Sequence, residues 1–150
     1  MSNILILFGS TGGNTKIVVD KVSNVLISQG HQVTVKRIEK ASAKDPFNFD
    51  LTILASPTYG HGVLQKDVKV FREKMLEESY INISFAVIGL GDYKYDADYH
   101  LESANILEET ITDLKGILAH DALRVSKSPL KTLTSIIPKW AQTLSDTLKK

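Results

Sequence analysis

A glycine-rich loop at residues 8–15 follows an apolar run at residues 4–8 and precedes an amphipathic stretch. Ser10, Thr11 and Thr15 supply hydroxyls there, and the glycines let backbone N–H groups approach a ligand closely. A helix starting after the loop would direct its unpaired first-turn amides and its positive dipole end to the same place. The segment therefore predicts an anion-binding loop between a strand and a helix. The alternative is a glycine-rich turn without a ligand.

Two common phosphate loops fit this segment badly. The G-x-x-x-x-G-K-S/T pattern fails because no Gly-Lys-Ser or Gly-Lys-Thr occurs in this region, and G-x-G-x-x-G fails because the glycines fall at positions 9, 12 and 13. A phosphate held by backbone amides and hydroxyls needs no lysine or arginine. Such a loop suits a nucleotide that is retained as a cofactor.

The loop closely resembles the phosphate loop of flavodoxins, usually written Ser/Thr-x-Thr-Gly-x-Thr. Ser10, Gly13 and Thr15 fall on that pattern, and Gly12 replaces its central threonine. Two later segments, which correspond in order and spacing to the loops that cover the two faces of the flavin, are residues 56–60 (SPTYG) and 89–95 (GLGDYKY). The whole chain is therefore similar to a short-chain flavodoxin.

This resemblance implies noncovalently bound FMN held by three loops. Its residues, carried over position by position, are Ser10, Thr11, Gly12, Gly13, Asn14 and Thr15 in the first loop, Pro57, Thr58, Tyr59, Gly60 and His61 in the second, and Leu90, Gly91, Asp92, Tyr95 and Tyr99 in the third. No residue pair forms a catalytic nucleophile and base, and the histidines lack metal-ligand spacing. The predicted site has no catalytic residue and no metal.

Aromatic residues in the second and third loops are expected to stack on the flavin. Tyr59 projects from a loop that ends at Gly60, and Tyr95 has the family's usual spacing for the opposite face, with Tyr93 and Tyr99 as rivals. The alternative is that these tyrosines only cap the core edge. His61 replaces a residue that is often acidic in the family, so it either tunes the flavin electrostatically or faces solvent.

The fold follows from alternating strand and helix patterns. Five strands are expected, at residues 3–8, 32–38, 51–56, 83–90 and 117–125, with helices near 15–29, 65–77, 101–114 and the C-terminus, the last one beginning near Ser135. Residues 39–49 are only weakly periodic, so the second crossover helix is expected to be short. Alternation of this kind predicts a doubly wound parallel α/β sheet with helices on both faces. The resemblance implies the strand order 2-1-3-4-5, which brings the three loops to one edge.

Length and composition define the class of protein. With 150 residues and 43% hydrophobic content, the chain is expected to form one domain over residues 1–150 and a monomer. It contains no cysteine, and no apolar run approaches the roughly 20 residues that span a bilayer. A net charge of +1 disfavours nucleic-acid binding. We expect a cytoplasmic protein without membrane contact.

The predicted function is a low-potential one-electron carrier. The resemblance implies a donor of the NAD(P)H-dependent flavodoxin/ferredoxin reductase type and redox-enzyme acceptors. Seven carboxylates lie between Asp92 and Asp113, and they form either a solvated helix face or a patch that steers a basic partner. The alternatives are a small NAD(P)H-dependent quinone or FMN reductase, which usually needs extra loops, and a flavodoxin-like activator of a metal enzyme.

Overall fold

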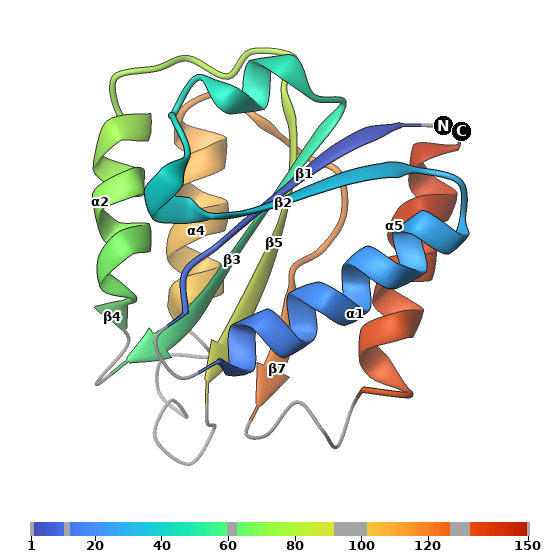
Figure 1. Ribbon diagram of the computed structural model, residues 1–150. Coiled ribbons are helices and arrows are strands. Elements are labelled where there is room, and N and C mark those ends of the chain that lie inside the picture. Colours follow the sequence, from blue (N-terminus) through green and yellow to red (C-terminus); the bar gives the residue numbers. More distant parts are fainter. Residues whose placement is uncertain (1, 11–12, 60–62, 92–101, 127–132, 150) are drawn as a thin grey trace.

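The computed structural model describes residues 2–10, 13–59, 63–91, 102–126 and 133–149 (Figure 1). The strands are β1 (Asn3–Phe8), β2 (Gln32–Arg37), β3 (Leu51–Tyr59), β4 (Val63–Leu64), β5 (Ser84–Gly91), β6 (Ile117–Leu118) and β7 (Leu123–Ser126). The α-helices are α1 (Asn14–Ser28), α2 (Lys66–Met75), α4 (Glu102–Asp113) and α5 (Ile136–Leu148), and two short 3-10 helices are η1 (Ile38–Lys40) and η2 (Asp45–Asn48).

The strands form one sheet in the order β2-β1-β3-β5, and β6 and β7 share the edge position beside β5. All of these pairs are parallel, and only the two-residue strand β4 runs antiparallel, beside the end of β3. Since β5 is the fourth long strand, the predicted order 2-1-3-4-5 is confirmed. Parallel neighbours require crossover connections, and the helices supply them.

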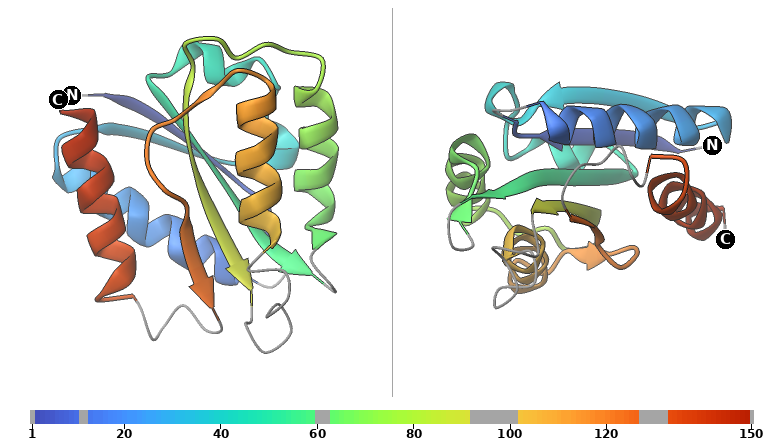
Figure 2. Two further views of the ribbon diagram at one scale, coloured as in Figure 1. Left: turned by 180° about the vertical axis from the view of Figure 1, so that it is seen from behind. Right: turned by 90° about the horizontal axis from the view of Figure 1, so that it is seen from below.

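Among the described residues, helices α1 and α5 cover one face of the sheet, and α2 and α4 cover the other (Figure 2). One hydrophobic core joins alternate residues of β1, β3 and β5, such as Ile6, Ile53 and Ile88, to α1 and α5. The other core joins the intervening residues, such as Leu7 and Leu54, to α2, α4 and η1. Burial on both faces explains why these strands are continuously apolar rather than alternating.

Local signals fix the ends of two helices. Gly30 has a φ of 94°, and its N–H donates to Ile27 O at 3.0 Å while the N–H of His31 donates to Leu26 O at 3.2 Å. This pair of bonds is the Schellman motif, which a glycine in the left-handed conformation allows. Helix α5 begins after Ser135, so Pro138 lies in the first turn, as the sequence predicts.

Three predicted elements differ from the structure. Strand β3, expected to end at residue 56, continues to Tyr59 because its last two residues pair with β4, so residues 57–59 are strand rather than loop. The strand expected at 117–125 is divided into β6 and β7, because the chain between them leaves the sheet and the carbonyl of Asp121 accepts a hydrogen bond from Trp140 Nε1 at 2.7 Å. The short helix expected within residues 39–49 is replaced by η1 and η2. Pro46 lies at the start of η2, and the carbonyl of Ala43 accepts a hydrogen bond from the buried Tyr80 hydroxyl at 2.7 Å.

Candidate cofactor site

The candidate site lies at the carboxyl ends of β1, β3 and β5, which reach the same edge of the sheet (Figure 1). Pro57 pairs with Leu90 in the register of β3 and β5, so the segments predicted as the second and third loops begin within neighbouring strands. Strand β1 ends at Phe8, opposite Ala55 of β3. This edge, where the connections diverge to opposite faces, is where open α/β sheets bind ligands.

The first loop is anchored within itself and leads into an open helix N-terminus. Ser10 Oγ accepts a hydrogen bond from the N–H of Gly13 at 2.9 Å, and Gly13 has a φ of 88° as the N-cap of α1. No side chain among the described residues caps α1, and its first turn contains no acidic residue. The buried Thr15 side chain makes no hydrogen bond among the described residues. The unpaired amides and this hydroxyl suit an anion.

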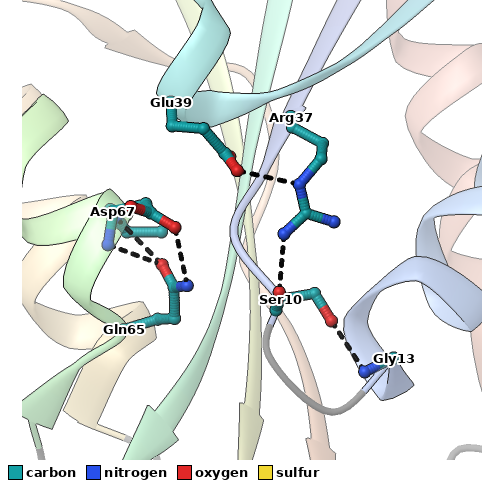
Figure 3. A network of polar contacts seen from close by, with 7 residues as sticks. Ser10, Gly13, Arg37, Glu39, Gln65 and Asp67 are labelled. Atoms are coloured by element: carbon teal, nitrogen blue, oxygen red, sulfur yellow. Dashed lines mark hydrogen bonds and ion pairs between the residues drawn. The ribbon is translucent and has the colours of Figure 1, made fainter.

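Arg37, the last residue of β2, adds a cation beside the first loop (Figure 3). Its Nη2 donates to the carbonyl of Ser10 at 2.7 Å, its Nε donates to Glu39 Oε2 at 2.9 Å, and its guanidinium carbon lies 5.4 Å from the centroid of the Phe8 ring. The hydrogen bond from Arg37 holds the pKa of the Glu39 carboxyl below its usual value. Arg37 therefore connects β2 to the loop after β1.

A second polar network joins the end of β3 to the start of α4. Thr58 Oγ1 donates to Ser103 Oγ at 2.6 Å, and Ser103 Oγ donates to the carbonyl of Ser56 at 3.3 Å. The backbone N–H of Ser103 also donates to Thr58 Oγ1, at 3.2 Å. A Cβ atom on Gly89 would lie 2.7 Å from Ala104 Cβ, so α4 packs directly on the backbone of β5. The network holds the end of β3 against α4 and β5.

The N-terminus of α2 lies next to the first loop but is closed by its own side chains (Figure 3). Gln65 Oε1 accepts from the N–H groups of Asp67 at 2.8 Å and Val68 at 3.1 Å. A Cβ atom on Gly9 would lie 2.4 Å from the same oxygen. Glycine at position 9 therefore allows the capped helix to pack directly against the backbone that begins the first loop.

Those predicted site residues that the structure describes lie at this edge of the sheet. They are Ser10, Gly13, Asn14 and Thr15 of the first loop, Pro57 and Thr58 with the main chain of Tyr59 in the second, and Leu90 and Gly91 in the third. The remaining predicted residues, Thr11, Gly12, Gly60, His61, Asp92, Tyr95 and Tyr99, and the rival Tyr93, lie outside the described residues.

Three residues near the site were not predicted from the sequence. Ser103 and Gln65 are buried polar side chains, but the sequence offers no sign that one bonds to Thr58 and the other caps α2. Arg37 could have been noticed. The order 2-1-3 places the end of the second strand beside the end of the first, so a basic residue there lies near the phosphate loop.

Comparison with known proteins identifies the family. Residues 6–140 match the family model described as flavodoxin. A flavodoxin of Nitratidesulfovibrio vulgaris is 27% identical over 144 residues, covering 94% of this chain and 95% of the relative. One of Trichodesmium erythraeum is 32% identical over 117 residues, covering 77% and 68%. The solved structure of oxidised flavodoxin 1 from Bacillus cereus has a TM-score of 0.86 at 23% identity, covering 99% of this chain and 98% of that one.

Proposed function

This chain belongs to the flavodoxin family, whose proteins bind FMN and transfer electrons rather than act as enzymes, and on that premise we propose that it is a low-potential one-electron carrier. FMN is held noncovalently in a single domain over residues 1–150, and the protein works as a cytoplasmic monomer. No helix in the described part of the chain is both long and apolar enough to cross a bilayer.

The observation that carries this proposal is the open N-terminus of α1. Ser10 Oγ already accepts the Gly13 amide, and this bond shapes the loop around the uncapped first turn. The amides at the start of α1 and the hydroxyl of Thr15 then bind the terminal phosphate through hydrogen bonds, with the helix dipole adding attraction. An acidic side chain in the first turn would compete with the phosphate, and the first turn contains none.

The other two loops position the ring. When bound, FMN supplies the electron transfer through its isoalloxazine ring. Thr58 and Ser103 hold the end of β3 against α4. These bonds would fix the backbone from which Tyr59 and Gly60 approach the ring. In this proposal Tyr95 would stack on the other face of the ring, Leu90, Gly91, Asp92 and Tyr99 would complete the third segment, and Pro57 and His61 would belong to the second segment with Tyr59 and Gly60. Thr11, Gly12 and Asn14 complete the phosphate loop.

The proposed donor is an NAD(P)H-dependent reductase of the flavodoxin/ferredoxin type, and the acceptors are redox enzymes. Strands β3 and β5 end at the proposed ring site, so a partner approaching that edge of the sheet meets the cofactor there. Helix α4 begins beside this edge and contributes the acidic Glu108 and Glu109, of which Glu108 pairs with Arg124 at 3.0 Å. Glu108 is neutralised by this pair, whereas an exposed carboxylate such as Glu109 favours a basic partner surface.

A stepwise reductive titration of the purified protein tests this function. We expect one FMN per chain, reduction in two separate one-electron steps, and no direct reduction by NAD(P)H alone. Two-electron reduction by NAD(P)H would indicate a quinone or FMN reductase instead. Failure to bind FMN would overturn the proposal.

A further inference from the structure

The guanidinium of Arg37 contacts the backbone carbonyl of Ser10, near the start of the phosphate loop. Arg37 and Phe8 are partners in the register of β2 and β1, and both are the last residues of their strands. The side chain extends past the Phe8 ring to the carbonyl of Ser10, and the 2.7 Å distance from Nη2 is short for an N–H···O bond. The loop is thus fastened to the neighbouring strand at its first residue.

Ser10 takes part in two of the contacts that hold the described part of the loop. Its carbonyl accepts a hydrogen bond from Arg37, and its hydroxyl accepts one from the N–H of Gly13, the residue at the N-cap position of α1. Through these two bonds Ser10 connects the end of β2 to the N-cap residue of α1. Arg37 therefore fixes the position of the residue on which the Gly13 amide is anchored.

Glu39 forms an ion pair with Arg37 and so limits the electrostatic field of its guanidinium. Its carboxylate is 2.9 Å from Arg37 Nε, and both side chains are about one-third or more exposed, at 40% for Arg37 and 35% for Glu39. The pair is electrically neutral as a unit, and solvent and salt weaken its field over distance. The short contact with the loop, rather than attraction over distance, is what Arg37 can contribute to anion binding.

We propose that Arg37 is a positioning residue of the phosphate loop, and that its hold on the Ser10 carbonyl makes this chain select FMN over the unphosphorylated riboflavin. This inference rests on the proposed function. It predicts that loss of Arg37 weakens binding of the phosphate and leaves binding of the ring unchanged.

The test compares two variants that each remove one positive charge from β2. Arg37→Gln removes the contact with Ser10, and Lys36→Gln removes a cation that pairs with Asp45 at 3.7 Å. Dissociation constants for FMN and riboflavin are measured with the apoprotein by quenching of flavin fluorescence. We expect Arg37→Gln to bind FMN about ten- to a hundredfold more weakly, as for loss of a hydrogen bond to a charged group. Its riboflavin affinity, and both affinities of Lys36→Gln, should change by less than about twofold.

Two further measurements separate positioning from folding. Hydrogen exchange of the Gly13 amide in the apoprotein should be faster in Arg37→Gln, because the loop loses its attachment to β2. Arg37→Lys should recover part of the FMN affinity, since an ammonium can donate to the same carbonyl. If Arg37→Gln does not fold, the FMN and riboflavin affinities of Arg37→Lys decide the question.

Three results would overturn the inference. Equal weakening of FMN and riboflavin would make Arg37 a stabiliser of the fold, and equal FMN affinities of the two Gln variants would leave Arg37 without a role. If the unaltered protein does not bind FMN, the proposed function itself fails, and this inference fails with it.

Discussion

The starts of α1 and α2 lie at the same edge of the sheet but on opposite faces, and their first-turn amides differ in whether a side chain caps them (Figure 3). Helix α1 begins after Gly13, is capped by no side chain of the described residues and carries no acidic residue in its first turn. Helix α2 begins after Gln65, whose side chain accepts from two amides, and Asp67 adds a negative charge. One helix start is left open and the other is closed.

This difference shows that an anion site at a helix start depends on the absence of a capping side chain there. Every α-helix begins with unpaired N–H groups and a positive dipole end, so the helix itself does not select the site. The residue before the first turn does. A glycine at that position has no side chain to offer the amides, and the closed neighbour shows what a polar side chain does there.

The largest effect is expected from closing the open helix. In Asn14→Asp, a carboxylate occupies the first turn of α1, where it repels the phosphate of FMN. At a separation near 5 Å this costs about 3 kcal/mol, which is roughly a hundredfold in the dissociation constant. The apoprotein should be stabilised by about 0.5 kcal/mol through the helix dipole. Fluorescence titration and denaturant unfolding measure the two effects.

The neutral variant Asn14→Ser is the control for this experiment. It removes the same side-chain carboxamide without adding charge, so its FMN affinity should stay close to that of the unaltered protein. If Asn14→Asp binds FMN as tightly as Asn14→Ser, the phosphate does not lie at the start of α1.

A smaller effect is expected from opening the closed helix. Gln65→Ala removes both bonds to the first turn of α2 and should lower the free energy of unfolding by about 1 kcal/mol. The affinity for FMN should remain unchanged, since the phosphate binds at α1. Denaturant unfolding of the apoprotein checks the first statement, and fluorescence titration checks the second.

Gln65→Asn is the matched variant, because it retains an amide oxygen that can accept from the same N–H groups. It should lose less stability than Gln65→Ala. Equal losses in the two variants would show that Gln65 stabilises the protein through packing alone.

The smallest effect concerns His31, which follows the C-terminal end of α1. Its backbone N–H donates to the Leu26 carbonyl of that helix. His31 Nδ1 accepts from the N–H of Ser2 at 3.1 Å, so Nε2 carries the hydrogen and donates to Ser145 Oγ at 2.9 Å. Burial, followed by the positive charges of the N-terminus and Lys149, lowers the pKa of His31. The unfolded chain therefore binds the proton more readily. Stability should be complete above about pH 6.5 and decline as the pH falls below it.

Thermal unfolding between pH 5 and pH 8 measures this decline, which should be smaller than the two effects above. The variant His31→Gln should show less of it, because its side chain does not titrate in that range. A pH dependence unchanged in His31→Gln would assign the effect to other groups.

The sequence predicts the fold well where local signals and burial agree. The apolar runs of β1, β3 and β5 are buried on both faces, and Gly30 and Pro138 mark helix ends by their own backbone restrictions. The edge strand at residues 117–125 is mispredicted in detail because its apolar pattern does not show that Trp140, far along the chain, bonds to Asp121. Tertiary contacts decide the form of such segments.

The candidate site is only partly predictable for the same reason. Ser10, Gly13 and Thr15 are identified by the spacing of one short motif. The bonds from Arg37 to Ser10 and from Thr58 to Ser103 join positions 27 and 45 residues apart, respectively. A motif describes neighbours in sequence, so it cannot include partners that only the folded sheet brings together.

The division of the core into two faces also sets an order for assembly during synthesis. The face covered by α2 and α4 draws its main residues from positions 5–111, so it can be completed while the chain is still being made. The face covered by α1 and α5 requires Trp140 and Leu144. Until the ribosome releases those residues, the apolar side of α1 and of the central strands is uncovered. This face is therefore where a nascent chain of this protein needs protection from aggregation.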